Sequence, residues 1–205
     1  MRNLLLLVGC LSLFASTYTA LLPVFADRTL HGGPRAMGLL MGAAGAGALV
    51  GALALGLGRP QGTPRWVGSA AVLFGGSLLA FSFSHSLPLS ALLMALVGCG
   101  FMIATATINT LIQMSVPDAC RGRVMSLYTV MFLGMVPLGG LLVGRTAPFL
   151  SAQAAVALAG TGALLAGILF AFSLAGEFAA ASAPALGRFL PSTISPLPEH
   201  AGLRP

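Results

Sequence analysis

The spacing of the charged residues is the feature of this sequence that most restricts its fold. Uncharged runs fill positions 3–26, 36–58, 66–117, 124–144 and 146–176, separated by short segments that carry the charges. About 20 consecutive apolar residues cross a bilayer as a helix, and a charge at the bilayer centre is unfavourable. Each run is therefore long enough for at least one membrane-spanning helix.

One of these runs is long enough to be divided by a turn, and another begins with a turn. The run 66–117 contains "SFSHSLPLS" at 82–90, where Ser, His and Pro indicate a turn, and "TAPFLS" at 146–151 is a second turn with Pro148 opening the next helix. The runs are continuous rather than alternating, which favours helices over a barrel. The prediction is six transmembrane helices at 3–26, 36–58, 66–83, 88–116, 122–145 and 149–176, followed by a disordered tail at 177–205 that contains five prolines.

Composition agrees with an all-α integral membrane protein. Only 7% of the 205 residues are charged, whereas a soluble domain has roughly a quarter. So few charges cannot cover a water-facing surface, and lipid is the expected partner of the rest. The net charge of +6 comes from arginines that stand singly or in pairs, which indicates topology signals rather than a nucleic-acid surface.

An even number of spans places both termini on the same side of the membrane. The positive-inside rule favours a cytoplasmic location for them. On that side would lie Arg2, Arg59, Arg65, Arg121, Arg123, Arg188 and Arg204, and on the other Arg28, Arg35 and Arg145.

Small residues indicate helix-packing faces in the second and fifth predicted helices. These are Gly38, Gly42, Gly47 and Gly51 in the second helix and Gly134, Pro137 and Gly139 in the fifth. In lipid, small residues let the backbone of another helix come close. The spacing is compatible with a face that slides against another bundle and equally with static packing inside this chain. The proline removes a helix hydrogen bond, so that the fifth helix could hinge or hold a fixed bend there.

Polar residues inside the spans are candidates for the lining of a substrate path. Thr105, Asn109 and Gln113 lie four apart and share one helix face, and Ser16 and Tyr18 belong to a weaker cluster in the first helix. The alternative is hydrogen bonding between helices or, for Ser and Thr, within their own helix. The sequence shows no catalytic constellation, and its three cysteines have no disulfide or metal spacing, so we expect no enzyme, cofactor or metal site.

A charged cluster, "VPDACRGR" at 116–123, interrupts the apolar sequence. Pro117 and Asp118 are expected to end the fourth helix and to cap the fifth. Arg121 and Arg123 then lie at the membrane surface. There they can bind lipid phosphates, pair with acids of a neighbouring loop or meet the carbonyls at another helix end.

The segment "VPDACRGRVMSLYTVMFLGMVPLGGLLVG" resembles the junction of the tenth and eleventh helices in major facilitator superfamily transporters, in the bacterial branch related to enterobactin and macrolide exporters. "TINTLIQMSVP" and "LLPVFADRTLHGGPRAMGLLMGAAGAGALVGA" are also similar to that branch, and the resemblance covers about residues 3–176. The chain resembles the C-terminal six-helix half-bundle alone, beginning at helix seven. Its "GRPQGTPR" loop at 58–65 lacks the acidic residue of the superfamily loop motif.

This resemblance implies a multi-pass protein of the bacterial inner membrane that exports small molecules by alternating access. Helices seven and ten of such proteins line the cavity, which implies lining roles for Ser16, Tyr18, Thr105, Asn109 and Gln113. Helices eight and eleven meet the other half, and Asp118, Arg121 and Arg123 would belong to a cytoplasmic gate.

Transport would then require another six-helix half or a second copy of the chain. Two alternatives remain open at this stage. One is a truncated product that transports nothing, and the other is a membrane subunit that binds a partner through the glycine-rich face of residues 38–56.

Overall fold

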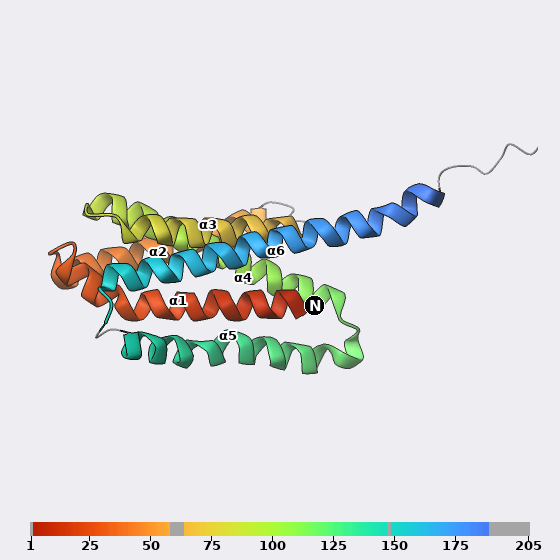
Figure 1. The fold of residues 1–205 in the computed structure, drawn as a ribbon, viewed down its shortest axis with the longest axis horizontal. Helices are drawn as coiled ribbons and strands as arrows, with labels where there is room; N and C mark the ends of the chain where they lie inside the picture. The colour runs from red at the N-terminus through yellow and green to blue at the C-terminus, as the bar shows by residue number, and fades with distance from the viewer. Residues whose placement is uncertain (1, 58–63, 147–148, 189–205) are drawn as a thin grey trace, which may run out of the picture.

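The computed structural model describes residues 2–57, 64–146 and 149–188, and nearly all of them are helical. The helices are α1 (Arg2–Arg28), α2 (Gly33–Leu57), α3 (Pro64–Ser82), α4 (Leu87–Ser115), α5 (Asp118–Thr146) and α6 (Ala152–Arg188) (Figure 1). All six are long and apolar enough to span a bilayer. The predicted all-α membrane fold with six spans is confirmed.

Three helix starts differ from the prediction by three or four residues, and the first of them is α2, which begins at Gly33 rather than at 36. Helix α5 begins at Asp118 rather than at 122, since the Pro117 carbonyl already accepts a hydrogen bond from the Cys120 amide at 3.0 Å. Helix α6 begins at Ala152 rather than at 149, where the Ser151 hydroxyl accepts a hydrogen bond from the Ala154 amide at 3.2 Å and caps the helix. Position 148, where the proline was expected to open this helix, lies outside the described residues.

The end of α6 is the largest departure from the prediction. The helix continues to Arg188, so residues 177–188 are helical and not part of a disordered tail. Alanine-rich sequence in this segment favours helix even without a membrane around it. The remainder of the predicted tail, 189–205, lies outside the described residues.

The helices pack as two related groups of three. Helix α1 packs against α5 and α6, α4 packs against α2 and α3, and α3 also packs against α6. Exchanging α1, α2 and α3 with α4, α5 and α6 reproduces these contacts. The first helices of the two groups run in opposite directions across the bundle (Figure 1), as an odd number of spans per group requires. The bundle therefore has the arrangement of an inverted repeat.

The core lies around α3, which is the most buried span, whereas α2 and α5 are the least buried. Phe74, Leu78 and Phe81 of α3 are fully buried, and the Phe81 ring lies 4.5 Å from that of Phe25 in α1. Close approach of α3 to α6 depends on glycine, because a Cβ at Gly160 would lie 2.6 Å from the Leu79 amide nitrogen. Helices α3 and α6 thus pack tightly against each other, whereas α2 and α5 have large exposed surfaces.

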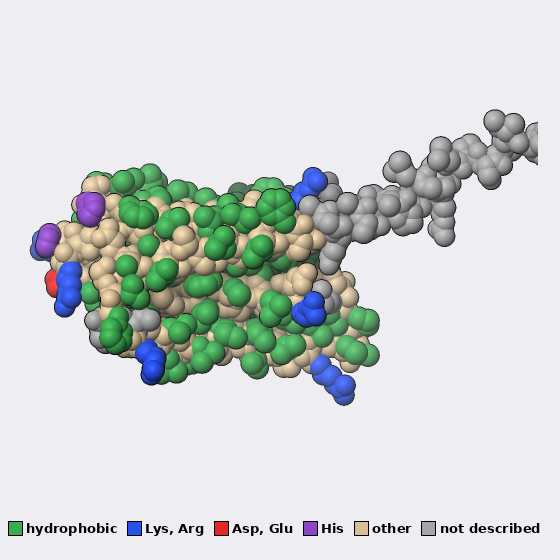
Figure 2. Space-filling model, viewed as in Figure 1, with side chains coloured by type: hydrophobic (Ala, Val, Ile, Leu, Met, Phe, Trp, Pro, Cys, Tyr) green, Lys and Arg blue, Asp and Glu red, His purple; other side chains and the backbone are tan. Residues whose placement is uncertain are grey.

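The surface has a broad apolar band with its charges at the two ends. Figure 2 shows hydrophobic side chains and uncharged atoms across the middle of the visible face and arginine, acidic and histidine side chains only at its ends. Many large apolar side chains in the band are exposed, including Leu133 and Leu141 on α5. So large an exposed apolar surface is stable in lipid rather than in water, which agrees with six membrane-spanning helices.

Candidate functional site

A polar ladder on α4 joins the interior of the bundle to the end of that helix. Thr105 is buried, Asn109 is half-buried and Gln113 is exposed, and the Gln113 amide donates a hydrogen bond to Oδ1 of Asn109. The Thr105 hydroxyl donates to the Phe101 carbonyl at 2.8 Å, within its own helix. The structure therefore brings these three predicted residues onto one face of α4. Thr105 makes a hydrogen bond within its own helix, which is the alternative to lining a substrate path.

Tyr128 of α5 completes this ladder and was missed by the sequence analysis. Its hydroxyl lies 3.4 Å from the Thr105 carbonyl oxygen, to which it donates, and it interacts with the side chain of Asn109. The signal that could have identified it is its rarity, because the chain has only two tyrosines and a phenol inside an apolar span needs a polar partner. Both tyrosines lie in the candidate site.

Tyr18, the other tyrosine, lines a small pocket where α1, α2 and α4 meet. The pocket has a volume of about 210 Å³ and is lined by Tyr18, Thr19, Leu22, Met41, Ala44 and Met94. The Tyr18 ring packs against Phe74, with ring centroids 6.3 Å apart. This predicted residue therefore stands at a pocket, and the two methionines give that pocket an adaptable apolar wall.

Ser16 has a different environment from Tyr18. It is buried, its hydroxyl donates to the Leu13 carbonyl at 2.8 Å, and it packs against Gly139 of α5, where a Cβ would collide with the serine oxygen. The structure places Ser16 in the contact between α1 and α5 and not at a described pocket. Its hydrogen bond is of the intrahelical kind.

A chain of aromatic rings connects the two tyrosines through the bundle. From Tyr18 it passes to Phe74, Phe101, Phe132 and Tyr128, with ring centroids 6.3, 5.4, 6.2 and 5.9 Å apart. These separations lie within the range of favourable ring contacts. The Tyr18 pocket and the α4 ladder are thus joined by a continuous wall contributed by α1, α3, α4 and α5.

The predicted packing residues fall into two groups. A Cβ at Gly47 would collide with the Ala95 carbonyl of α4, one at Gly51 would lie 2.9 Å from the Cys99 carbonyl oxygen, and one at Gly139 would collide with α1. In contrast, the structure has no atom of another helix near the Cβ positions of Gly38, Gly42 and Gly134, and Pro137 is exposed. The first group packs inside the chain, and the second lies on open surface.

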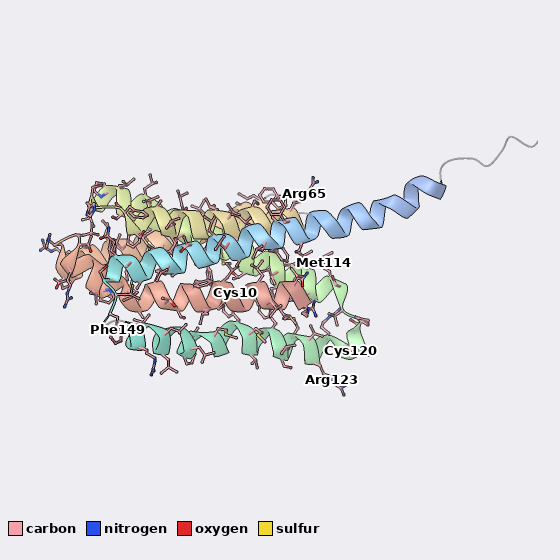
Figure 3. The ribbon with its side chains drawn as sticks, viewed as in Figure 1. Cys10, Arg65, Met114, Cys120, Arg123 and Phe149 are labelled. Carbon is pink, nitrogen blue, oxygen red and sulfur yellow. The ribbon has the colours of Figure 1, made fainter. Side chains whose placement is uncertain are left out.

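The charged cluster at the start of α5 is exposed. Arg121 pairs with Asp118 on the same helix at 2.6 Å, and both side chains are largely in solvent. The Arg123 side chain points away from the bundle (Figure 3). An exposed pair of this kind contributes about 0.5 kcal/mol or less, so it orders the helix end only weakly. Within the described residues, neither arginine contacts an acid of another loop.

The described part of the chain contains no group of three or more histidine, cysteine or acidic residues that could hold a metal ion. Cys10, Cys99 and Cys120 are free thiols, two of them in the spans and the third exposed at the charged cluster. The candidate site consists instead of neutral hydroxyl, amide and aromatic groups. Such groups can bind and orient an uncharged molecule by hydrogen bonds and ring contacts.

Comparison with known proteins agrees with this picture of a membrane transporter. Residues 1–197 match the model of a major facilitator family described as transmembrane secretion effector. No curated protein matches the chain. With the match covering almost all of the sequence, including all six spans, this multi-pass membrane protein belongs to the transmembrane secretion effector family of major facilitator transporters.

Proposed function

We propose that this chain forms one six-helix half of a small-molecule exporter that works by alternating access, with the cavity on α1 and α4. The observation that carries the proposal is the open surface of α2 and α5, the two helices that the repeat relates to each other. Each flanks a helix with candidate lining residues, since α2 packs on α4 and α5 packs on α1. A second bundle docked on both would enclose the polar groups between the halves.

The open glycines of α2 and α5 support the docking of a second bundle. Nothing lies within 4 Å of a Cβ built at Gly38, Gly42 or Gly45 of α2, or at Gly140 or Gly144 of α5. Helices in lipid associate through close packing at small residues, because the hydrophobic effect does not drive them together there. The second bundle can be part of another polypeptide or a second copy of the chain.

Tyr18, Asn109 and Gln113 are the residues that we propose to contact the transported molecule. Tyr18 lines the pocket between α1, α2 and α4, and the two amides follow the polar ladder towards the end of α4. Thr105 and Ser16 bond to their own helices, so their contribution is to the shape of the wall. The proposed lining is uncharged, which fits a substrate recognised by shape and by a few hydrogen bonds.

The exposed cluster of Asp118, Arg121 and Arg123 is proposed as part of a cytoplasmic gate. If this cluster is on the cytoplasmic side of the bacterial inner membrane, both termini of the bundle are cytoplasmic as well. The arginines at this end among the described residues are Arg2, Arg65, Arg121, Arg123 and Arg188, against Arg28, Arg35 and Arg145 at the other, which agrees with the positive-inside rule. The outward direction of Arg123 leaves it available to an acid of the opposing half.

Efflux from bacterial cells tests the function. Cells would be loaded with ethidium, a cation, or Nile red, an uncharged dye, and would express the chain alone or with a six-helix bundle encoded beside it. We expect efflux only with both, and a loss of it with Asn109→Leu but not with Ser69→Ala, an exposed control on α3 whose hydroxyl bonds its own helix. Full efflux by the chain alone, as a monomer, would contradict the need for a second half.

A second candidate function is that of a membrane subunit that binds a different protein through the open face of α2. Gly42→Cys in a Cys120→Ser background tests it by crosslinking in the membrane. Gly47 is unsuitable as the probe position, because the Ala95 backbone occupies the space of its side chain. A crosslink to a six-helix bundle supports the exporter, whereas a crosslink to a protein without one supports the subunit.

A further inference from the structure

Helices α2 and α4 touch closely at one level and separate towards the end of α2. At the contact, Gly47 faces the Ala95 carbonyl and Gly98 faces the Ala44 carbonyl, in both cases too closely for a side chain. One turn further, a Cβ at Gly51 would lie 2.9 Å from the Cys99 oxygen. At Gly56, no atom of the described residues lies within 4 Å of a Cβ, so α2 and α4 have separated there.

The separation leaves a groove with a volume of about 340 Å³. Its lining is Ala52, Leu55 and Gly56 from α2 and Met102, Ala106, Thr107 and Thr110 from α4. None of these side chains is charged. A volume of this size lies at the lower end of the range for pockets that hold small molecules.

Thr107 is the residue that makes this groove more than a gap between helices. Its side chain is 4% exposed, and its hydroxyl has no hydrogen-bond partner among the described residues. Thr110, in the same lining, donates to the Ala106 carbonyl at 3.0 Å as threonines in helices commonly do. A buried hydroxyl without a partner is unfavourable by about 1 to 3 kcal/mol, and such groups are rare in native structures.

We infer that this groove is a binding site for an uncharged, mostly apolar small molecule whose one polar group hydrogen-bonds to the Thr107 hydroxyl. The absence of charge among the described lining residues disfavours an ion, which would lose its hydration there without compensation. A phospholipid chain lying in the groove would place only methylene groups against Thr107 and would leave the hydroxyl unpaired. The inference concerns binding by this chain and does not rest on transport.

Comparison with Ser12 shows that an unpaired buried hydroxyl does not by itself indicate a binding site. Ser12 is the other buried residue in the described chain whose hydroxyl has no partner, but it lines none of the three described pockets. Of these two hydroxyls, the one at Thr107 adjoins a described groove that a ligand can enter.

N-Phenyl-1-naphthylamine is a suitable probe because it is uncharged and mostly apolar, has a single N–H group and fluoresces more strongly in apolar surroundings. The full chain, purified in detergent, would be titrated with the probe, and the signal of protein-free detergent subtracted. We expect saturable binding that Thr107→Val weakens about five-fold, through the loss of one hydrogen bond. Thr107→Ser, which keeps the hydroxyl, should bind within two-fold of the original protein.

Two further variants separate the site from general effects. Thr110→Val makes the same chemical change in the same groove at a satisfied hydroxyl, and we expect less than a two-fold effect. Gly56→Leu places a side chain into open space and should abolish saturable binding. Unfolding temperatures measured without the probe confirm folding, and Thr107→Val should be no less stable than the original protein, because it removes an unpaired buried hydroxyl.

Equal effects of Thr107→Val and Thr110→Val would overturn the inference, as would saturable binding that survives Gly56→Leu. Native mass spectrometry adds an arm for the lipid. If the purified chain retains a phospholipid that Gly56→Leu releases, the groove is a lipid site and the small-molecule assignment is wrong. Retention of phospholipid that is equal in both proteins, together with probe binding lost in Gly56→Leu, supports the assignment.

Discussion

Glycines of two kinds stand side by side in this bundle. At one kind, the backbone of a neighbouring helix occupies the space of a side chain, and at the other kind that space is open. The first group is Gly47, Gly51, Gly98 and Gly139, and the second is Gly38, Gly42, Gly45, Gly134, Gly140 and Gly144. Small residues in a span are therefore compatible with close packing, but they do not show whether the partner is a helix of the same chain or a second bundle.

Helical geometry explains why both kinds occur on α2. Gly38 and Gly42 are four residues apart and share a face, as do Gly47 and Gly51. From Gly38 to Gly47 there are nine residues, which at about 100° per residue places them roughly half a turn apart. The first pair faces away from α4 and the second pair faces it. Static packing inside the chain therefore applies to Gly47 and Gly51, whereas a face that slides against another bundle stays a prediction for Gly38 and Gly42.

Gly47→Leu should give the largest effect, because the new side chain would have to displace the α4 backbone at Ala95. We expect destabilisation by more than about 3 kcal/mol, or a fall of about 10 °C in the unfolding temperature of the purified chain. Gly42→Leu is the matched control on the same helix, with open space at its Cβ. Similar losses in both variants would contradict the division of the glycines.

Leucines at the open glycines should instead impair assembly. Gly42→Leu combined with Gly140→Leu is expected to keep the unfolding temperature of the chain within about 3 °C. The same pair should strongly reduce copurification with a second bundle and dye efflux, because helix backbones can no longer approach. Unchanged copurification would show that these faces meet lipid rather than protein.

Arg121→Ala with Arg123→Ala should reduce efflux several-fold while leaving membrane insertion and stability nearly unchanged. The Asp118 pair is exposed and weak, so its loss has little effect on the fold. Arg28→Ala with Arg35→Ala removes the same charge from the opposite end and should affect efflux less. If efflux survives the first pair and only orientation changes, these arginines act as topology signals and not as a gate.

Tyr128→Phe should have the smallest effect, and that effect is on the free energy of unfolding. Tyr128 lies on the inner side of α5, whereas Gly140 lies on its outer side. The substitution removes the long hydrogen bond to the Thr105 carbonyl, at 3.4 Å, and the interaction with the Asn109 side chain, and it keeps the ring stacked on Phe132. The expected destabilisation is about 0.5 kcal/mol, and Tyr128→Leu, which also removes the stack, should lose about 1 kcal/mol more. Thermal unfolding of the purified chain measures both, and equal losses would assign the contribution to the hydroxyl alone.

The sequence predicted the spans well because a long run without charges is stable in lipid, and because the length of a run shows whether a helix can cross the bilayer. It did not predict that α6 continues to Arg188, since hydropathy reports only the part of a helix that lipid requires. It grouped Thr105, Asn109 and Gln113 correctly from their spacing of four. It could not find Tyr128 as their partner, because that contact joins residues 23 apart in sequence across two helices.

The length of α6 has a consequence for where the chain leaves the membrane. Its uncharged run ends at Gly176, and the helix continues to Arg188 beyond the end of the bundle (Figure 1). The twelve residues 177–188, at about 1.5 Å each, extend the helix by roughly 18 Å, which is longer than the headgroup layer of one leaflet is thick. A fluorescent protein fused at Arg188 would be held clear of the lipid and would report which compartment receives this end of the chain.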